Sequence, residues 1–320
     1  MDIDNPCLLP RGIVPVIQTP FSATGLIDWD SLGRLITDAI SAGVAGFLAP
    51  AVASEVAFLS ISEREELLKC LVARLPDRFP LIVGASSDDP RICRSMADIA
   101  IELHAAAWLV AVPQSLYQSP PQIMAFFREV CGDIPLPLII QDLQFGGPGL
   151  SLNLIRDLQQ QLPQFQGIKI ETVPAGPKYS AVREALGSDF YIAGGWAVPQ
   201  MIEALDRGID AMIPESSMVR VYQTIYFHYQ SGRRDAALKL FRQLLPVLAF
   251  TNQELAVSIA FFKRLLVRKK LFASDALRIG GFSWDDYSRR IADELIEYYL
   301  TLESHCASIG PKFHSMPRNS

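Results

Sequence analysis

Lys169 lies in the run Gly167-Ile168-Lys169-Ile170-Glu171, where a short apolar stretch predicts a buried strand. A lysine in such a place is unusual, because removing an ammonium group from water is costly. Buried lysines in general respond with a lowered pKa, and a neutral amine can attack a carbonyl carbon to form a Schiff base. Strand periodicity places Lys169 and Glu171 on one face. The pair therefore indicates Schiff-base chemistry, unless the strand lies at an edge and the lysine points to water.

Glu171 has a structural and a chemical interpretation. As a charged residue just past a strand end it needs no function. Beside an imine-forming amine it is a candidate general acid or base, because buried carboxylates can be tuned to exchange protons near neutral pH. The choice between the two depends on whether other polar residues meet this pair.

The elements that must position the pair alternate between short apolar runs and longer amphipathic ones. The apolar runs are near-continuous, as is typical of parallel strands buried on both faces. They cover residues 13–18, 46–50, 81–84, 108–112, 136–142, 167–170, 190–194 and 211–214. Helical patterns lie between them, including 29–42, 199–207 and a helix to about Leu75 that opens on a capping box at Ser62 and Glu65. Eight such units predict an α/β fold, a (β/α)₈ (TIM) barrel over residues 1–218.

After this region the strand pattern stops. Helical patterns cover 219–231, 233–248, 253–270 and 284–303. We expect residues 219–303 to form a C-terminal helical region packed on the barrel. Residues 304–320, which include Gly310, Pro311 and Pro317, are expected to form a disordered tail.

In such a barrel, chemistry takes place at the C-terminal ends of the strands. The candidate site residues near those ends are Ala53, Ser54, Gln141, Asp142, Lys169, Glu171, Gly194, Gly195 and Glu215. Some of them also have a purely structural interpretation: Asp142 as a turn residue, the two glycines as a turn and Glu215 as a helix-start carboxylate. A lysine and several carboxylates that converge on one mouth favour a functional site.

Composition excludes several classes of protein. The net charge is −5 and no basic stripe occurs, which argues against a nucleic-acid partner. The acidic N-terminus does not resemble a signal peptide, the uncharged stretch 39–54 is too short for a membrane span, and the five cysteines have no paired spacing. We therefore expect a cytoplasmic protein. Neither a zinc-type histidine spacing nor a nucleotide-binding glycine motif is present, so no metal and no cofactor are expected.

The chain resembles the dihydrodipicolinate synthase/N-acetylneuraminate lyase superfamily of Schiff-base lyases over about residues 12–302. The resemblance is carried by Thr19-Pro20-Phe21, Gly25-Leu26-Ile27-Asp28, Ser54-Glu55, Gly167-Ile168-Lys169 and Gly194. It implies that Lys169 forms an imine with a small-molecule 2-oxo acid. It also implies a homo-oligomer, most often a tetramer, and the apolar residues Phe261, Phe262, Leu265 and Leu266 exceed what a lone helical flap needs.

Departures from the family pattern bear on the reaction. The loop that usually reads Gly-Thr-Thr-Gly-Glu is Ala51-Val52-Ala53-Ser54-Glu55, and Gln141-Asp142 replaces the usual Tyr-Asn. The segment 145–149 has no arginine of the kind that holds the distal carboxylate in lysine biosynthesis. Gln-Asp, Lys-x-Glu and Gly-Gly on successive strands resemble instead the subgroup of 2-keto-3-deoxy-L-arabonate dehydratases.

The resemblance implies dehydration of a 2-keto-3-deoxy sugar acid. Lys169 would form the imine, Glu171 would move protons with help from Asp142, and Ser54 with backbone amides near Ala53 would bind the carboxylate. Gln141, Gly194, Gly195 and Glu215 would complete the substrate site. Three alternatives remain: an aldolase that uses the same enamine, a condensing enzyme of the dihydrodipicolinate synthase type, and a barrel that binds a 2-oxo acid without turnover.

Overall fold

The computed structural model describes residues 9–77, 79–195 and 199–309. Its eight strands form one parallel sheet in the order β1-β8-β7-β6-β5-β4-β3-β2. The strands are β1 (Gly12–Ile13), β2 (Phe47–Ala49), β3 (Leu81–Gly84), β4 (Ala107–Ala111), β5 (Leu138–Asp142), β6 (Phe165–Ile170), β7 (Tyr191–Gly194) and β8 (Ala211–Met212). The segment after β1 closes the sheet onto β2, because Ile17 N–H donates to Leu48 O at 3.0 Å and Leu48 N–H donates to Pro15 O at 3.0 Å. The predicted (β/α)₈ barrel is confirmed.

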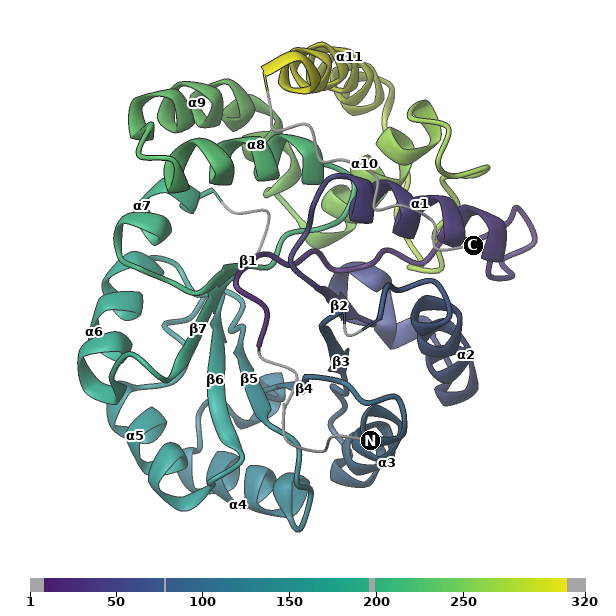
Figure 1. Cartoon of the computed structure of the whole chain (residues 1–320). Coiled ribbons are helices and arrows are strands. Elements are labelled where there is room, and N and C mark those ends of the chain that lie inside the picture. Colours follow the sequence, from purple (N-terminus) through teal and green to yellow (C-terminus); the bar gives the residue numbers. More distant parts are fainter. Residues whose placement is uncertain (1–8, 78, 196–198, 310–320) are drawn as a thin grey trace.

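The helices surround this sheet (Figure 1). They are α1 (Trp29–Ser41), α2 (Ile61–Val72), α3 (Pro90–Glu102), α4 (Pro120–Cys131), α5 (Leu152–Gln161), α6 (Gly176–Leu186), α7 (Met201–Asp206), α8 (Val219–Gln230), α9 (Arg234–Thr251), α10 (Leu255–Arg268) and α11 (Asp286–Ile309), with short 3₁₀ turns η1 (Val52–Ser54), η2 (Val56–Phe58) and η3 (Gln114–Leu116). No helix among the described residues has the length and apolar character that crossing a membrane requires.

The start of α2 differs from the prediction. Its N-cap is Ser60, whose Oγ accepts from Glu63 N–H at 3.2 Å while Glu63 Oε2 accepts from Ser60 N–H at 2.9 Å. The capping box is thus Ser60 and Glu63, because the helix begins at Ile61. Glu65 lies further along the helix, where it pairs with Lys69.

Strand alternation divides the core into two layers. Residues such as Ile139, Ala193 and Ile213 pack inside the barrel. Their strand neighbours, such as Ile140 and Ile192, pack outward against the helices. Side-chain parity along β5, β6 and β7 therefore decides which polar residues face the barrel interior.

The four C-terminal helices α8–α11 gather on one side of the barrel (Figure 1). Phe261, Phe262, Leu265 and Leu266 of α10 are all buried within the chain. Some of these residues were expected to cover the barrel and some to meet a partner. Phe262 does line the pocket at the barrel mouth, but none of the four is left exposed for a partner, so that part of the expectation is wrong. Helix α11 continues to Ile309, past the expected end of the helical region at Glu303, and residues 310–320 of the expected tail lie outside the described residues.

Candidate active site

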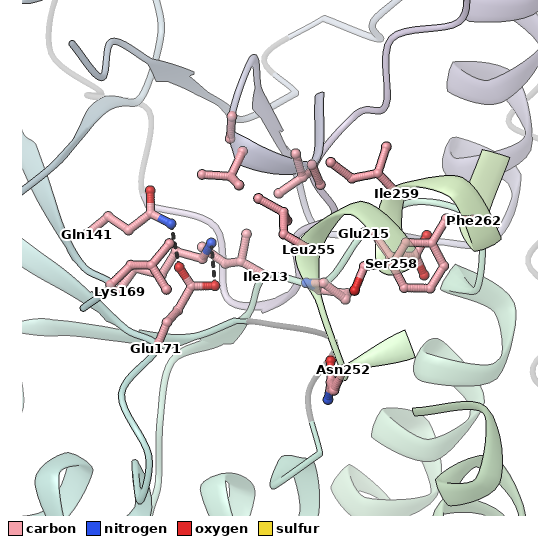
Figure 2. A pocket seen from close by; sticks show the side chains of 16 residues that line it. Gln141, Lys169, Glu171, Ile213, Glu215, Asn252, Leu255, Ser258, Ile259 and Phe262 are labelled. Atoms are coloured by element: carbon pink, nitrogen blue, oxygen red, sulfur yellow. Dashed lines mark hydrogen bonds and ion pairs between the residues drawn. The ribbon is translucent and has the colours of Figure 1, made fainter. Parts of the chain in front are cut away.

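Lys169 and Glu171 meet inside the mouth of the barrel. The strand register pairs Lys169 with Gln141 on β5 and with Ala193 on β7, an inward-facing layer. Lys169 Nζ lies 3.0 Å from Glu171 Oε1, and each side chain is only 4% exposed. The interpretation of an edge strand with a solvent-facing lysine is therefore wrong. A primary amine and a carboxylate, both almost fully buried, are in direct contact at the wall of a pocket (Figure 2).

Gln141 completes this contact from the neighbouring strand. Its Nε2 donates to Glu171 Oε2, so that the two carboxylate oxygens face two different donors. Gln141 Oε1 is buried and has no hydrogen-bond partner among the described residues. The amide thus orients Glu171 and keeps one acceptor unused at the pocket wall.

The two glycines after β7 have different surroundings. A Cβ on Gly195 would lie 2.1 Å from Glu171 Oε1 and 2.5 Å from Lys169 Cε. A Cβ on Gly194 would instead lie 2.6 Å from the Tyr179 hydroxyl, on the helix side of the strand. Gly195 therefore belongs to the site, since only glycine leaves room there for the amine and the carboxylate. Gly194 belongs to the packing of α6.

Ser54 is buried at the end of η1, but its hydroxyl is already used. Ser54 Oγ donates to Ile17 O at 2.5 Å and accepts from Ala51 N–H at 3.0 Å. A hydroxyl has one proton to donate, so this one is not available to a carboxylate. The expectation that the Ser54 side chain binds substrate is corrected: it holds the loop, while Val52 and Ala53 line the pocket.

Asp142 faces away from the pocket. It follows the inward-facing Gln141 on β5, and parity turns it toward the helices. Its carboxylate accepts from Lys178 Nζ at 2.5 Å, from the Tyr117 hydroxyl at 3.2 Å and from Leu150 N–H at 2.9 Å. Burial raises the pKa of Asp142, against the opposing effect of the Lys178 ammonium. The expected role of Asp142 in proton transfer is corrected: it ties the loop after β5 to α6.

Glu215 lies at the pocket wall and serves the chain as a helix-start carboxylate. Its two oxygens accept from the N–H groups of Ser217 and Met218, the latter at 3.2 Å, just before α8. Burial raises its pKa to about 7. The structural interpretation of this residue is the one that its contacts support.

Sequence reasoning missed the roof of the pocket, which comes from the C-terminal helices. Asn252 precedes α10, and four residues of α10 face the same cavity as Lys169 (Figure 2). These four are Leu255, Ser258, Ile259 and Phe262. An amphipathic pattern showed that this helix has a buried face, but nothing local in the sequence indicates that the face covers the barrel mouth.

A second buried lysine was also missed as a structural feature. Lys263 Nζ donates to Glu55 Oε1, and neither side chain is exposed. Glu55 Oε2 accepts from the N–H groups of Arg278 at 2.8 Å and Ile279 at 2.9 Å. Burial lowers the pKa of Lys263 to about 8, and its ammonium lies 4.1 Å from the centre of the Phe21 ring. Lys263 next to the apolar residues Phe261 and Phe262, with Leu265 and Leu266 following Arg264, was the available signal.

The described residues contain no group of three His, Cys, Asp or Glu side chains arranged to hold a metal ion. The chemistry that the pocket offers is that of its own side chains. An amine and a carboxylate in contact with it are the groups needed to form an imine and to move protons next to it, and the amide fixes the orientation of the carboxylate.

The amino-acid sequence is similar to a family of known proteins over most of its length. A model of the dihydrodipicolinate synthetase family matches residues 9–278. The L-2-keto-3-deoxyarabonate dehydratase of Azospirillum brasilense is 27% identical over 274 residues, which cover 84% of this chain and 87% of that protein. A 4-hydroxy-tetrahydrodipicolinate synthase of Acidothermus cellulolyticus is 26% identical over 315 residues, which cover 93% and 92%.

Solved structures agree with this result. The dihydrodipicolinate synthase of Rhodopseudomonas palustris superposes with a TM-score of 0.82 at 24% identity, and the alignment covers 92% of this chain and 97% of that chain. The likeness shows a shared fold. The family match over residues 9–278, most of the chain, shows that this chain belongs to the dihydrodipicolinate synthetase family.

Proposed function

We propose that this protein dehydrates a 2-keto-3-deoxy acid, that is, a 4-hydroxy-2-oxo acid, through an imine on Lys169. As a member of its family, the chain is an enzyme of the Schiff-base lyase and aldolase class. The observation that supports dehydration through Lys169 is the 3.0 Å contact between Lys169 Nζ and Glu171 Oε1, two buried side chains.

Imine formation is the first step of this reaction. Glu171 takes a proton from the Lys169 ammonium, and the neutral amine attacks C2 of the 2-oxo acid. The carbinolamine then loses its hydroxyl as water, with the proton that Glu171 took from the lysine, which leaves a protonated imine and an unprotonated Glu171. The positive charge on this nitrogen acidifies the C3 hydrogens. The Lys169–Glu171 contact supports this step because donor and acceptor already touch.

Elimination is the second step. Glu171 removes a proton from C3, and the electron pair forms the enamine. The enamine expels the C4 hydroxyl, which leaves as water with a proton returned by Glu171. Hydrolysis of the imine releases the product and regenerates Lys169. The substrate thus loses one water molecule in total, and no oxidant or further reactant is needed.

The substrate carboxylate is assigned to η1. Val52 and Ala53 line the pocket in the first turn of this 3₁₀ helix. First-turn N–H groups have no partner within a helix, so they can donate to an anion. This assignment replaces the Ser54 hydroxyl with backbone amides of the same loop.

Dehydration is favoured over condensation because the site lacks the groups that condensation uses in the family. Gln141 stands where the proton-relaying tyrosine is usual, and an amide does not relay protons. No arginine lines the pocket among the described residues. Elimination needs only the imine, a base at C3 and an acid at the C4 hydroxyl, which Lys169 and Glu171 provide.

Product analysis tests this function. The purified protein is incubated with a panel of 2-keto-3-deoxy acids, and the products are identified by mass spectrometry, with Lys169→Arg as the control. We expect a product lighter than the substrate by one water, and none with the control. Pyruvate plus an aldehyde would make the protein an aldolase. If acids of the panel bind to the protein but none of them is converted, the non-catalytic binding barrel would be favoured.

A further inference from the structure

We propose that the natural substrate carries an uncharged, apolar group beyond C4, in place of the polyol tail of a sugar acid or a second acid group. This inference rests on the imine at Lys169 proposed above, and it specifies what the remainder of the pocket accepts.

The wall and roof of the pocket away from Lys169 are formed by aliphatic and aromatic side chains. They come from three regions of the barrel mouth and from α10, which lays its apolar face over the cavity (Figure 2). The residues are Val16, Leu143, Ile213, Leu255, Ile259 and Phe262. A substrate tail that extends from the imine carbon therefore contacts carbon atoms.

The polar side chains of the pocket are largely occupied by the protein itself. Ser258 Oγ donates to Thr251 O, and the Glu215 carboxylate accepts from two backbone N–H groups. Two buried amide oxygens of the pocket lining, Gln141 Oε1 and Asn252 Oδ1, have no partner among the described residues.

Gln141 Oε1 can serve one hydroxyl of the substrate. The amide contacts Glu171, the base proposed for C3, through Nε2, which leaves its unpaired oxygen available to the hydroxyl on the adjacent carbon, C4. In the rest of the pocket Asn252 Oδ1 is the one buried side-chain acceptor of the described lining that has no partner at all. A polyol needs a partner for every buried hydroxyl, and each one left unpaired is costly. The pocket therefore accepts the C4 hydroxyl and disfavours a polyol tail.

The charges of the pocket disfavour a second acid group. Its described lining contains one cationic side chain, Lys169, which the imine uses. Lys263 is on the same helix as the roof residues, but its ammonium is bound to Glu55 outside the cavity. A distal carboxylate or phosphate would be buried near Glu215 and Glu171 without a counter-ion, which is strongly unfavourable.

A matched series of substrates tests this inference on the unmodified enzyme. The series is racemic 4-hydroxy-2-oxoheptanoate, 2-keto-3-deoxyheptonate and 4-hydroxy-2-oxopimelate, which share a chain length and differ only in the tail. Kcat/KM is measured for each, and imine formation is followed separately by borohydride trapping and intact mass. Each hydroxyl beyond C4 that is buried without a partner should lower kcat/KM by about fivefold or more, so we expect the apolar acid to exceed the polyol by at least about 10-fold and the dicarboxylate by more.

Two variants of α10 add a control. Leu255→Asn places a polar group in the roof and should narrow the preference for the apolar acid by at least about fourfold. Val257→Asn makes a similar change on the same helix at a partly buried position that does not line the pocket, and should leave the preference unchanged. If Leu255→Asn does not fold, the comparison of substrates on the unmodified enzyme still decides.

Equal or better use of the polyol or the dicarboxylate would overturn the inference and leave the imine mechanism intact. If none of the three acids is turned over but all are trapped, the relative extents of trapping report the same tail preference. Absence of trapping with every acid, pyruvate included, would reject the imine itself and this inference with it.

Discussion

Glu171 is in contact with both of the other polar side chains at the centre of the pocket. Lys169 Nζ lies 3.0 Å from one of its oxygens, and Gln141 Nε2 donates to the other. The carboxylate therefore has a fixed orientation beside the amine. This geometry suits a group that first accepts a proton from the lysine and then exchanges protons with the carbon next to the imine.

Replacement of this carboxylate separates its role in turnover from its role in imine formation. Glu171→Gln keeps the size of the side chain and removes its basicity, so kcat should fall by about 10²- to 10⁴-fold. The final extent of borohydride trapping of pyruvate on Lys169 should remain largely intact, although trapping becomes slower, because water can take the lysine proton in place of Glu171 whereas proton removal at C3 needs the positioned carboxylate. A loss in the final extent of trapping equal to the loss of turnover would show that Glu171 acts only by supporting Lys169.

Gly195 provides a second test at this scale. Gly195→Ala would place a methyl group 2.1 Å from Glu171 Oε1 and 2.5 Å from Lys169 Cε, so the pair must move. A displacement of about 1 Å in a catalytic group can cost about 10²-fold in rate, and we expect a loss of that order in both trapping rate and kcat. Gly280→Ala is the matched control, since its Cβ would have no heavy atom within 4 Å. Unchanged activity in Gly195→Ala would show that the glycine is not needed.

The limits of prediction from sequence are clear at single residues. Lys169 and Glu171 could be placed together because two residues apart on a strand share a face. The same rule separates Asp142 from Gln141, although both had been assigned to the site. Ser54 could not be judged locally, since its hydroxyl is used by Ile17 O, which is distant in the sequence.

Among the elements, α10 forms the roof of the pocket, and a buried ion pair joins it to the rest of the barrel mouth. Lys263 on α10 donates to Glu55, which follows η1, and Glu55 also accepts from the N–H groups of Arg278 and Ile279 in the segment after α10. One carboxylate thus joins the roof helix to the loop that carries Val52 and Ala53.

Removing one partner of this pair should destabilise the protein strongly. Lys263→Met leaves a buried carboxylate without its cation, and such changes cost about 3–5 kcal/mol in the free energy of unfolding. Adding Glu55→Gln should recover part of the loss, because the amide oxygen still accepts from the backbone and no charge remains. Denaturant unfolding measures both variants. Lys69→Met, which breaks an exposed ion pair with Glu65, is the control and should change stability little. A similar small effect for Lys263→Met would contradict the role assigned to the pair.

Strands and helices were predicted well as elements, because apolar runs and amphipathic periods are local properties of the chain. Their ends were predicted less well. The run 13–18 was expected to form one strand, but regular pairing is confined to Gly12–Ile13, and the rest joins the barrel through isolated bridges. The placement of α10 over the barrel mouth depends on contacts such as Lys263–Glu55, which join residues far apart in the chain and leave no local pattern.

At the scale of the whole molecule, the closed barrel brings residues from five strand ends and from α10 to one cavity. This convergence was predictable, since parallel strands of a barrel end at the same mouth. The quaternary structure could not be predicted from such a local pattern. The apolar residues of α10 that had suggested an interface are consumed by packing within the chain.

A homotetramer stays a prediction that follows from the family resemblance. Light scattering of the purified protein at micromolar concentration should give a mass of about four chains. A monomer at that concentration would contradict the prediction, and it would also mean that one chain alone forms the complete pocket.

The identity of the nucleophile is the central claim, and covalent trapping tests it most directly. The protein is incubated with pyruvate and borohydride, and the modified residue is located by peptide mass spectrometry. We predict that one ligand mass is added to the peptide that contains Lys169. Lys169→Arg should abolish the adduct and turnover while remaining folded, because its guanidinium stays protonated. Modification of Lys178 or of the buried Lys263 instead, or an adduct that persists in Lys169→Arg, would contradict the account.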